Sequence, residues 1–152
     1  MKKLVQAKLS DDDMSEDENI IKDVVPLGKI KCYISGKLRK ETPEEYVRQE
    51  VARSLVNEYG YTKENMEVEF KITMGRANKK ADIVVFKENS EHTQENIYLI
   101  AEVKKETIRP SDKENGIEQL NSYIAASMNC KYALWVGSER LSYIVNEKNG
   151  TR

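Results

Sequence analysis

The sequence predicts an α/β fold in which a mixed central sheet is flanked by helices, with a core in the order α-β-β-β-α-β. Two patterns predict this order. Apolar residues recur at three- and four-residue spacing within 43–59 and 117–128, which indicates helices, and they alternate or run together between 66 and 104, which indicates strands. At 152 residues the chain is long enough to bury one core, so we expect a single domain.

The first helix is predicted to run from residue 43 to residue 59. Thr42 is a suitable N-cap, Pro43 fits the first helical position, and Glu45 stands three residues after the cap, as in a capping box. An apolar series at helical spacing then leads to Gly60: Val47, Val51, Leu55, Val56 and Tyr59. Residues 29–35, upstream of this helix, are ambiguous, and at most a short edge strand is expected there.

Three strands are predicted next, at 66–74, 81–86 and 97–104. In the first, four apolar side chains alternate with polar ones and are expected to face the core together: Val68, Phe70, Ile72 and Met74. Residues 75–80 are predicted to form a tight basic turn, which makes the first two strands a hairpin. A polar loop at 87–96 leads to the third strand.

After Arg109-Pro110 the pattern becomes helical again, with apolar residues at Ile117, Leu120, Ile124 and Met128. A strand is predicted at 131–136, where Trp135 is expected in the core, and a short last strand at 141–145. The whole is expected to divide into an N-terminal extension at 1–27, a folded domain at 28–146, and a tail at 147–152.

Composition excludes several classes of protein. The charged fraction is 34%, and no apolar run approaches the 18 residues of a membrane span, so no membrane role is indicated. No apolar stretch follows the lysines at the N-terminus, so we expect no secretory signal and a cytoplasmic protein. Cys32 and Cys130 are far apart in sequence and are expected to be reduced apolar fillers.

Charge argues only weakly for nucleic acid. The net charge is −1, and residues 11–18 alone hold six acids, in a run that is typical of a solvated connection. Residues 1–19 combine those six acids with three lysines, so the rest of the chain has a net charge of +2.

Three charged residues lie where apolar strands meet polar ends. Glu102 and Lys104 share one face of a strand, and Asp82 joins them if its own strand pairs alongside. Two carboxylates and the backbone carbonyl of Val103 would suit Mg²⁺ for phosphodiester hydrolysis, because this ion prefers oxygen ligands and keeps several waters. Lys104 would either draw a proton from the metal-bound water or hold the developing charge as a fixed cation. The alternative is a same-face ion pair on a solvated strand end.

Six short motifs follow one another along the chain: Thr42-Pro-Glu-Glu-Tyr-Val-Arg-Gln49, Tyr59-Gly-Tyr61, Gly75-Arg76, Lys80-Ala-Asp82, Ala101-Glu102-Val-Lys104-Lys105 and Glu118-Gln119-Leu-x-x-Tyr123. In this order they resemble the N-terminal nuclease domain of the restriction (R) subunit of type I restriction enzymes, within the PD-(D/E)xK nuclease superfamily. The resemblance covers about residues 30–145. The family's proline before the first acid is replaced here by Ala81, a departure that is frequent in this group.

The resemblance implies a restriction-endonuclease-like fold and a Mg²⁺-dependent endodeoxyribonuclease with Asp82, Glu102 and Lys104 as its catalytic set. It also implies catalytic roles for Gln119 and Tyr123, which share a helix face at i and i+4. Gln119 could hydrogen-bond a DNA phosphate or fix Lys104, with Tyr123 as its support. The alternative for Tyr123 is a packing aromatic. Two residues of the first helix are further candidates. Glu45 could lean toward the metal or serve only the capping box, and Arg48 could clamp a phosphate or a carboxylate.

Double-stranded DNA is the expected substrate. Candidate DNA contacts are Arg76, Lys79, Lys80, Lys105 and Arg48. The resemblance implies partner subunits for modification and specificity, and ATP use only through a motor domain that follows this domain in the family, since no phosphate-binding loop motif is present here. Two other functions stay open: a catalytically silent DNA-binding or docking module of the same fold, and the nuclease domain of a fused or solitary restriction-modification protein.

Overall fold

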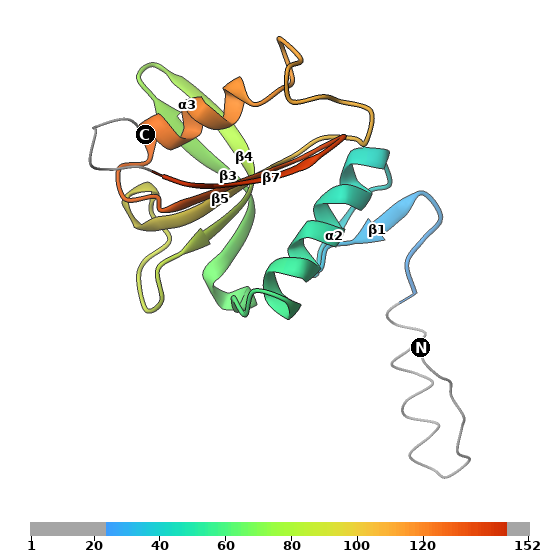
Figure 1. Cartoon of the computed structure of the whole chain (residues 1–152). Coiled ribbons are helices and arrows are strands. Elements are labelled where there is room, and N and C mark those ends of the chain that lie inside the picture. Colours follow the sequence, from blue (N-terminus) through green and yellow to red (C-terminus); the bar gives the residue numbers. More distant parts are fainter. Residues whose placement is uncertain (1–23, 146–152) are drawn as a thin grey trace.

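The structure is a computed structural model that describes residues 24–145. The predicted acidic run at 11–18 and the tail at 147–152 lie outside these residues. A central sheet is covered on one face by helix α3 (Glu118–Ala126) and on the other by helix α2 (Pro43–Asn57) (Figure 1). The predicted α/β class with a mixed sheet is therefore confirmed, in the order expected of a restriction-endonuclease-like fold.

The five strands of the central sheet lie side by side in the order in which they occur in the chain. They are β3 (Met66–Met74), β4 (Ala77–Phe86), β5 (Ile97–Val103), β6 (Tyr132–Val136) and β7 (Arg140–Ile144). All neighbours are antiparallel except β5 and β6, which are parallel and are joined by the crossover through α3. Strand β5 therefore lies between an antiparallel neighbour, β4, and a parallel one, β6.

Both helices begin close to the predicted residues and end earlier than predicted. Thr42 caps α2, its hydroxyl accepting the amide of Glu45 at 3.0 Å, and the helix ends at Asn57, two residues before the predicted end. The second helix stops at Ala126, so the prediction that Met128 continues its apolar face was wrong, and Met128 is exposed. Short 3₁₀ turns at Lys63–Asn65 and Gln94–Asn96 lead into β3 and β5.

A second, two-stranded sheet precedes α2. Its strands are β1 (Lys29–Lys31) and β2 (Leu38–Lys40), which pair antiparallel and are not hydrogen-bonded to the central sheet. The prediction of one short edge strand within 29–35 was therefore incomplete. In Figure 1 this β1–β2 ribbon appears beside α2.

The two faces of the sheet carry two hydrophobic clusters, and β3 changes face part-way along. Met66 and Val68 pack with the α2 cluster, whereas Phe70 and Ile72 pack with the α3 cluster. Glu69, between these pairs, has φ 52°, in the left-handed region, and forms no ladder pair. The predicted common face for Val68, Phe70, Ile72 and Met74 was therefore wrong, because this one residue interrupts the alternation.

The β3–β4 turn is shorter than predicted. Only Gly75 and Arg76 lie between Met74 and Ala77, which are ladder partners, and Gly75 adopts φ 63° as a two-residue hairpin turn requires. Lys79 and Lys80 therefore belong to β4 rather than to the turn. Trp135 is fully buried, as expected. Between residues 24 and 145, no helix is both long enough and apolar enough to span a membrane.

Candidate active site

Asp82 and Glu102 meet where β4 and β5 part. The last ladder pair between these strands is Ile83 with Ala101, so the next pair would be Asp82 with Glu102. Side chains replace the missing backbone bonds there. The amide of Asp82 donates to Glu102 Oε1 at 3.3 Å, and the amide of Val103 donates to Asp82 Oδ2 at 2.9 Å. Two carboxylates are thereby fixed at one strand end, although burying charged groups beside an apolar core costs free energy.

Lys104 joins this pair from the end of β5. Its Nζ lies 3.6 Å from Glu102 Oε2 and donates to Gln119 Oε1 at 3.1 Å. Gln119 Nε2 donates in turn to the hydroxyl of Tyr123 at 3.3 Å, and that hydroxyl donates to the backbone carbonyl of Lys80 at 2.9 Å. Gln119 and Tyr123, at positions i and i+4 of α3, thus connect Lys104 to the backbone of β4 at Lys80.

Arg48 reaches the site from α2. The guanidinium is buried, and its Nη2 donates to Asp82 Oδ1 at 2.9 Å. Its Nη1 donates to Glu45 Oε1 at 3.1 Å, while Nε is buried without a hydrogen-bond partner among the described residues. In this structure Arg48 holds a carboxylate, one of the two roles that the sequence left open.

The carboxylate of Glu45 is held by three hydrogen-bond donors. Its Oε1 accepts from Arg39 at 2.8 Å as well as from Arg48, and its Oε2 accepts from Gln49 at 2.7 Å. These three donors satisfy a carboxylate that is only 6% exposed. Glu45 therefore serves as a structural bridge between β2 and α2, besides its amide bond to the Thr42 cap.

Glu69 is the strained residue next to the site, since it falls opposite Asp82 in the β3–β4 register. Its carboxylate pairs with Arg39 at 2.8 Å and with Arg48 at 3.8 Å. The hydrogen bond from Arg39 lowers the pKa of Glu69, so the ion pair persists to acidic pH. Left-handed backbone costs on the order of 1–3 kcal/mol for such a residue and commonly marks functional sites.

Burial, and then the negative charge of Asp82, raise the pKa of Glu102 well above the ordinary carboxylate value, even though Lys104 opposes this. Glu44 behaves similarly. Burial followed by the charge of Asp82 raises the pKa of Glu44, and the charges of Lys104 and Arg48 oppose it. Burial and the charge of Asp82 therefore both disfavour the ionised forms of Glu102 and Glu44.

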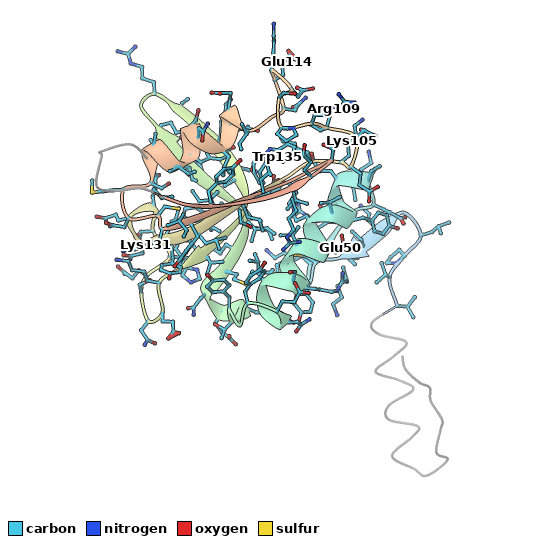
Figure 2. The ribbon with its side chains drawn as sticks, viewed as in Figure 1. Glu50, Lys105, Arg109, Glu114, Lys131 and Trp135 are labelled. Carbon is cyan, nitrogen blue, oxygen red and sulfur yellow. The ribbon has the colours of Figure 1, made fainter. Side chains whose placement is uncertain are left out.

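The predicted DNA-contacting residues are spread around this site. Lys79 lines a groove of about 660 Å³ between the β3–β4 hairpin and α3, and Gln119 also borders this groove. Arg76 is at the hairpin tip, six residues from Asp82, or roughly 20 Å along an extended strand. Lys105 is exposed and borders a different groove, against α2. Figure 2 shows Lys105 close to the α2 end of the sheet and Lys131 at the opposite end.

Three residues of the site were missed from the sequence: Arg39, Glu44 and Glu69. Glu44 could have been found, because it stands four residues before Arg48 and so shares its helix face. Glu69 and Arg39 carried no usable signal. Glu69 looked like an ordinary outward residue of an alternating strand, and Arg39 lies on a strand that the sequence did not predict.

Comparison with known proteins decides the family. The model of the type I restriction enzyme R protein N terminus matches residues 43–151, which include α2 and the whole central sheet. The chain belongs to this family. No curated protein and no solved structure was found to match. The β1–β2 ribbon precedes the matched region, so the family model does not describe it.

Membership places the chain in the restriction system and confirms the family that the six motifs indicated. Among residues 24–145, no three histidine, cysteine or acidic side chains are grouped as a metal site. The predicted set of two carboxylates and one backbone carbonyl needs no such group, since Mg²⁺ keeps several waters. Catalytic roles for Asp82, Glu102 and Lys104 stay a prediction.

Proposed function

We propose that this domain is a Mg²⁺-dependent endonuclease that hydrolyses DNA phosphodiester bonds within a type I restriction enzyme. One observation carries the proposal: Asp82 and Glu102 hold each other across the parting of β4 and β5, with Lys104 Nζ 3.6 Å from Glu102. Two acids and a lysine at a strand end, in a family of restriction subunits, support DNA cleavage better than any other reaction.

The residues fit a divalent cation. Each carboxylate oxygen that accepts one hydrogen bond has a second lone pair. The pKa of Glu102 is raised first by burial and then by the charge of Asp82, and a bound cation would favour the ionised form. Asp82, Glu102 and the carbonyl of Val103 would hold Mg²⁺. When bound, Mg²⁺ supplies charge neutralisation and a more acidic water.

Lys104, Tyr123 and Arg48 would position the site and balance its charge. Lys104 is fixed by Gln119 and Glu102, so its ammonium is preorganised to stabilise negative charge on a phosphate. Tyr123 limits the motion of Gln119 and ties it to β4. Arg48 holds Asp82 by one oxygen and leaves its other oxygen to the amide of Val103.

Nothing in the described residues forms a recognised base-reading element, so we propose that cleavage by this domain is independent of sequence. Phosphate contacts position a protein on DNA without reading its bases. In a restriction complex the recognition site would then be read by a separate specificity subunit, and methylation would belong to a modification subunit.

A catalytically silent DNA-binding module is the second candidate, and one observation favours it. Arg48 already pairs with Asp82 at 2.9 Å, so part of the negative charge that would attract a metal is neutralised within the protein. The two functions differ in whether DNA is cut.

Nicking of supercoiled plasmid by the purified chain distinguishes them. We expect open-circle product with Mg²⁺ but not with EDTA, its loss in Asp82→Ala, and its retention in Glu88→Ala, an exposed acid in the 87–96 loop. Equal nicking by Asp82→Ala and the unaltered chain would refute the site. DNA binding without Mg²⁺-dependent nicking would favour the silent module.

A further inference from the structure

The β1–β2 ribbon is the most basic segment of the chain. Residues 29–40 contain four lysines, one arginine and no acid, in a protein whose net charge is −1. This segment lies outside the region that the family model matches, and the candidate DNA contacts predicted from the sequence do not include it. Such a concentration of one sign of charge indicates an anionic partner.

The pairing register gathers lysines on one face of the ribbon. Lys29 is directly opposite Lys40, and Lys31 is opposite Leu38, so these four side chains share a face. Lys29 and Lys40 are exposed and form no ion pair with another described residue. Like charges directly across a ladder are destabilising, so the fold gains nothing from this pair by itself.

The opposite face fixes the ribbon to the domain. It carries Arg39, which pairs with Glu45 and Glu69 at 2.8 Å each. The loop between the strands adds two anchors, because Cys32 is buried and the amide of Tyr33 donates to Gln49 Oε1 at 2.6 Å. The lysine face is therefore held in place before any partner binds, which lowers the cost of binding.

The ribbon is also close to the candidate active site. Glu45 accepts from both Arg39 and Arg48, and Arg48 contacts Asp82 at 2.9 Å. The carboxylate of Glu45 therefore lies between Arg39 of the ribbon and Arg48, which pairs with Asp82. Two more cations lie over the ring of Tyr33, in the loop between the two strands. Lys63 Nζ is 3.9 Å and Arg53 Cζ is 5.6 Å from the ring centroid.

We propose that the β1–β2 ribbon is a second DNA-binding surface, whose Lys29 and Lys40 contact the phosphate backbone of the duplex beside the cleavage site. This inference rests on the proposed nuclease function for the identity of the anion. A duplex offers closely spaced phosphates, and a rigid pair of lysines neutralises them regardless of base sequence.

Salt-dependent binding tests the proposal. Affinity for a fluorescent duplex is measured from low to moderate salt without divalent ions, for the full chain, for Lys29→Ser/Lys40→Ser and for Lys87→Ser/Lys131→Ser. The control removes the same charge at the opposite end of the sheet, where Figure 2 shows Lys131. Each phosphate contact contributes about 0.9 to the slope of log affinity against log salt, so the ribbon variant should lower the slope by about 1.8, and the control should leave it unchanged.

A second experiment tests whether the ribbon lysines bind DNA or the acidic run of the same chain. It repeats the measurements in a chain whose six acids at residues 11–18 are replaced by serine. In this background the ribbon substitutions should still lower the slope of log affinity against log salt. Loss of their effect in this background would assign the lysines to the acidic run and overturn the proposal. Equal slopes for the ribbon and control variants, in a chain that still nicks plasmid, would overturn DNA binding by the ribbon and leave the proposed nuclease function standing. A chain that neither binds duplex nor nicks plasmid would overturn the nuclease function as well.

Discussion

The carboxylate of Glu102 accepts the backbone amide of Asp82 at 3.3 Å, one residue beyond the last β4–β5 ladder pair. The amide of Val103 returns a bond to Asp82 at 2.9 Å, so two acidic side chains complete a backbone pattern. Their negative charges are close because the ladder places them there. The site is therefore built into the strand parting itself, and its charge has consequences that experiments can measure.

Lys104 is expected to be needed for cleavage and not for folding. Lys104→Ala removes a fixed cation beside Glu102 and should lower the nicking rate by about 10²–10³, the loss found when one preorganised charge-stabilising donor is removed. Lys87→Ala is the matched control, because it removes an exposed lysine that is not among the candidate DNA contacts. Circular dichroism should be unchanged in both. A Lys104→Ala rate close to that of Lys87→Ala would contradict the assigned role.

Glu102 should make the metal-free protein less stable as pH rises. Burial and the charge of Asp82 raise the pKa of Glu102 in the folded state, so the folded protein binds more protons than the unfolded chain between the ordinary glutamate pKa and that raised value. Stability is therefore lost as pH increases through this window. Glu102→Gln should be more stable than the unaltered chain at pH 8, by about 1.4 kcal/mol for each unit of the shift, and the difference should vanish near pH 4.

Urea unfolding at both pH values, in EDTA, measures this effect. Glu88→Gln controls for the loss of a surface charge, because Glu88 is exposed in the 87–96 loop. A Glu102→Gln protein that is less stable than the unaltered chain at pH 8 would show that the carboxylate is adequately neutralised in the fold.

Tyr123 is expected to matter through its hydroxyl. Tyr123→Phe keeps the buried ring and removes the bonds to Gln119 and to the carbonyl of Lys80, which should cost about 1–3 kcal/mol of stability because that carbonyl loses its partner. Nicking should slow as Gln119 and Lys104 lose their support. Mg²⁺ affinity, read by the thermal shift, should stay unchanged. Unchanged nicking would show that Tyr123 is a packing aromatic, the alternative that the sequence left open.

Asp82 should be required for stabilisation by Mg²⁺. At ten times its dissociation constant, Mg²⁺ should stabilise the unaltered chain by about 1.4 kcal/mol, and this gain should disappear in Asp82→Ala. Repulsion between the two carboxylates would by itself leave metal-free Asp82→Ala no less stable than the unaltered chain, unless Asp82 forms a structural hydrogen bond. Asp82 does form such bonds, because it pairs with buried Arg48 and accepts from Val103.

We therefore expect metal-free Asp82→Ala to melt lower, by at least the roughly 1–3 kcal/mol of an unsatisfied buried donor. Thermal melts of both proteins with and without Mg²⁺ measure the two effects separately. The same Mg²⁺ shift in both proteins would place the ion elsewhere in the chain.

Local sequence patterns were enough to predict the order of the two helices and five strands of the central domain, and the residues of the central cluster. Periodicity, the Thr42 cap and the turn at Gly75 are local signals, because each depends on residues only a few positions apart. The ordered motifs then indicated the family that comparison confirmed. Asp82, Glu102 and Lys104 were identified because strand ends are where charge next to apolar runs is conspicuous.

The partners of the surrounding charged residues became visible only in the folded protein. The change of face at Glu69, the bridging of Arg39 and Arg48 by Glu45, and the proximity of Glu44 to Asp82 all depend on contacts between residues far apart in sequence. Arg39 and Glu69 are 30 residues apart along the chain and 2.8 Å apart in space. No periodicity encodes such a pair, since its energy arises only once the ribbon, helix and sheet have packed and excluded water from the charges between them.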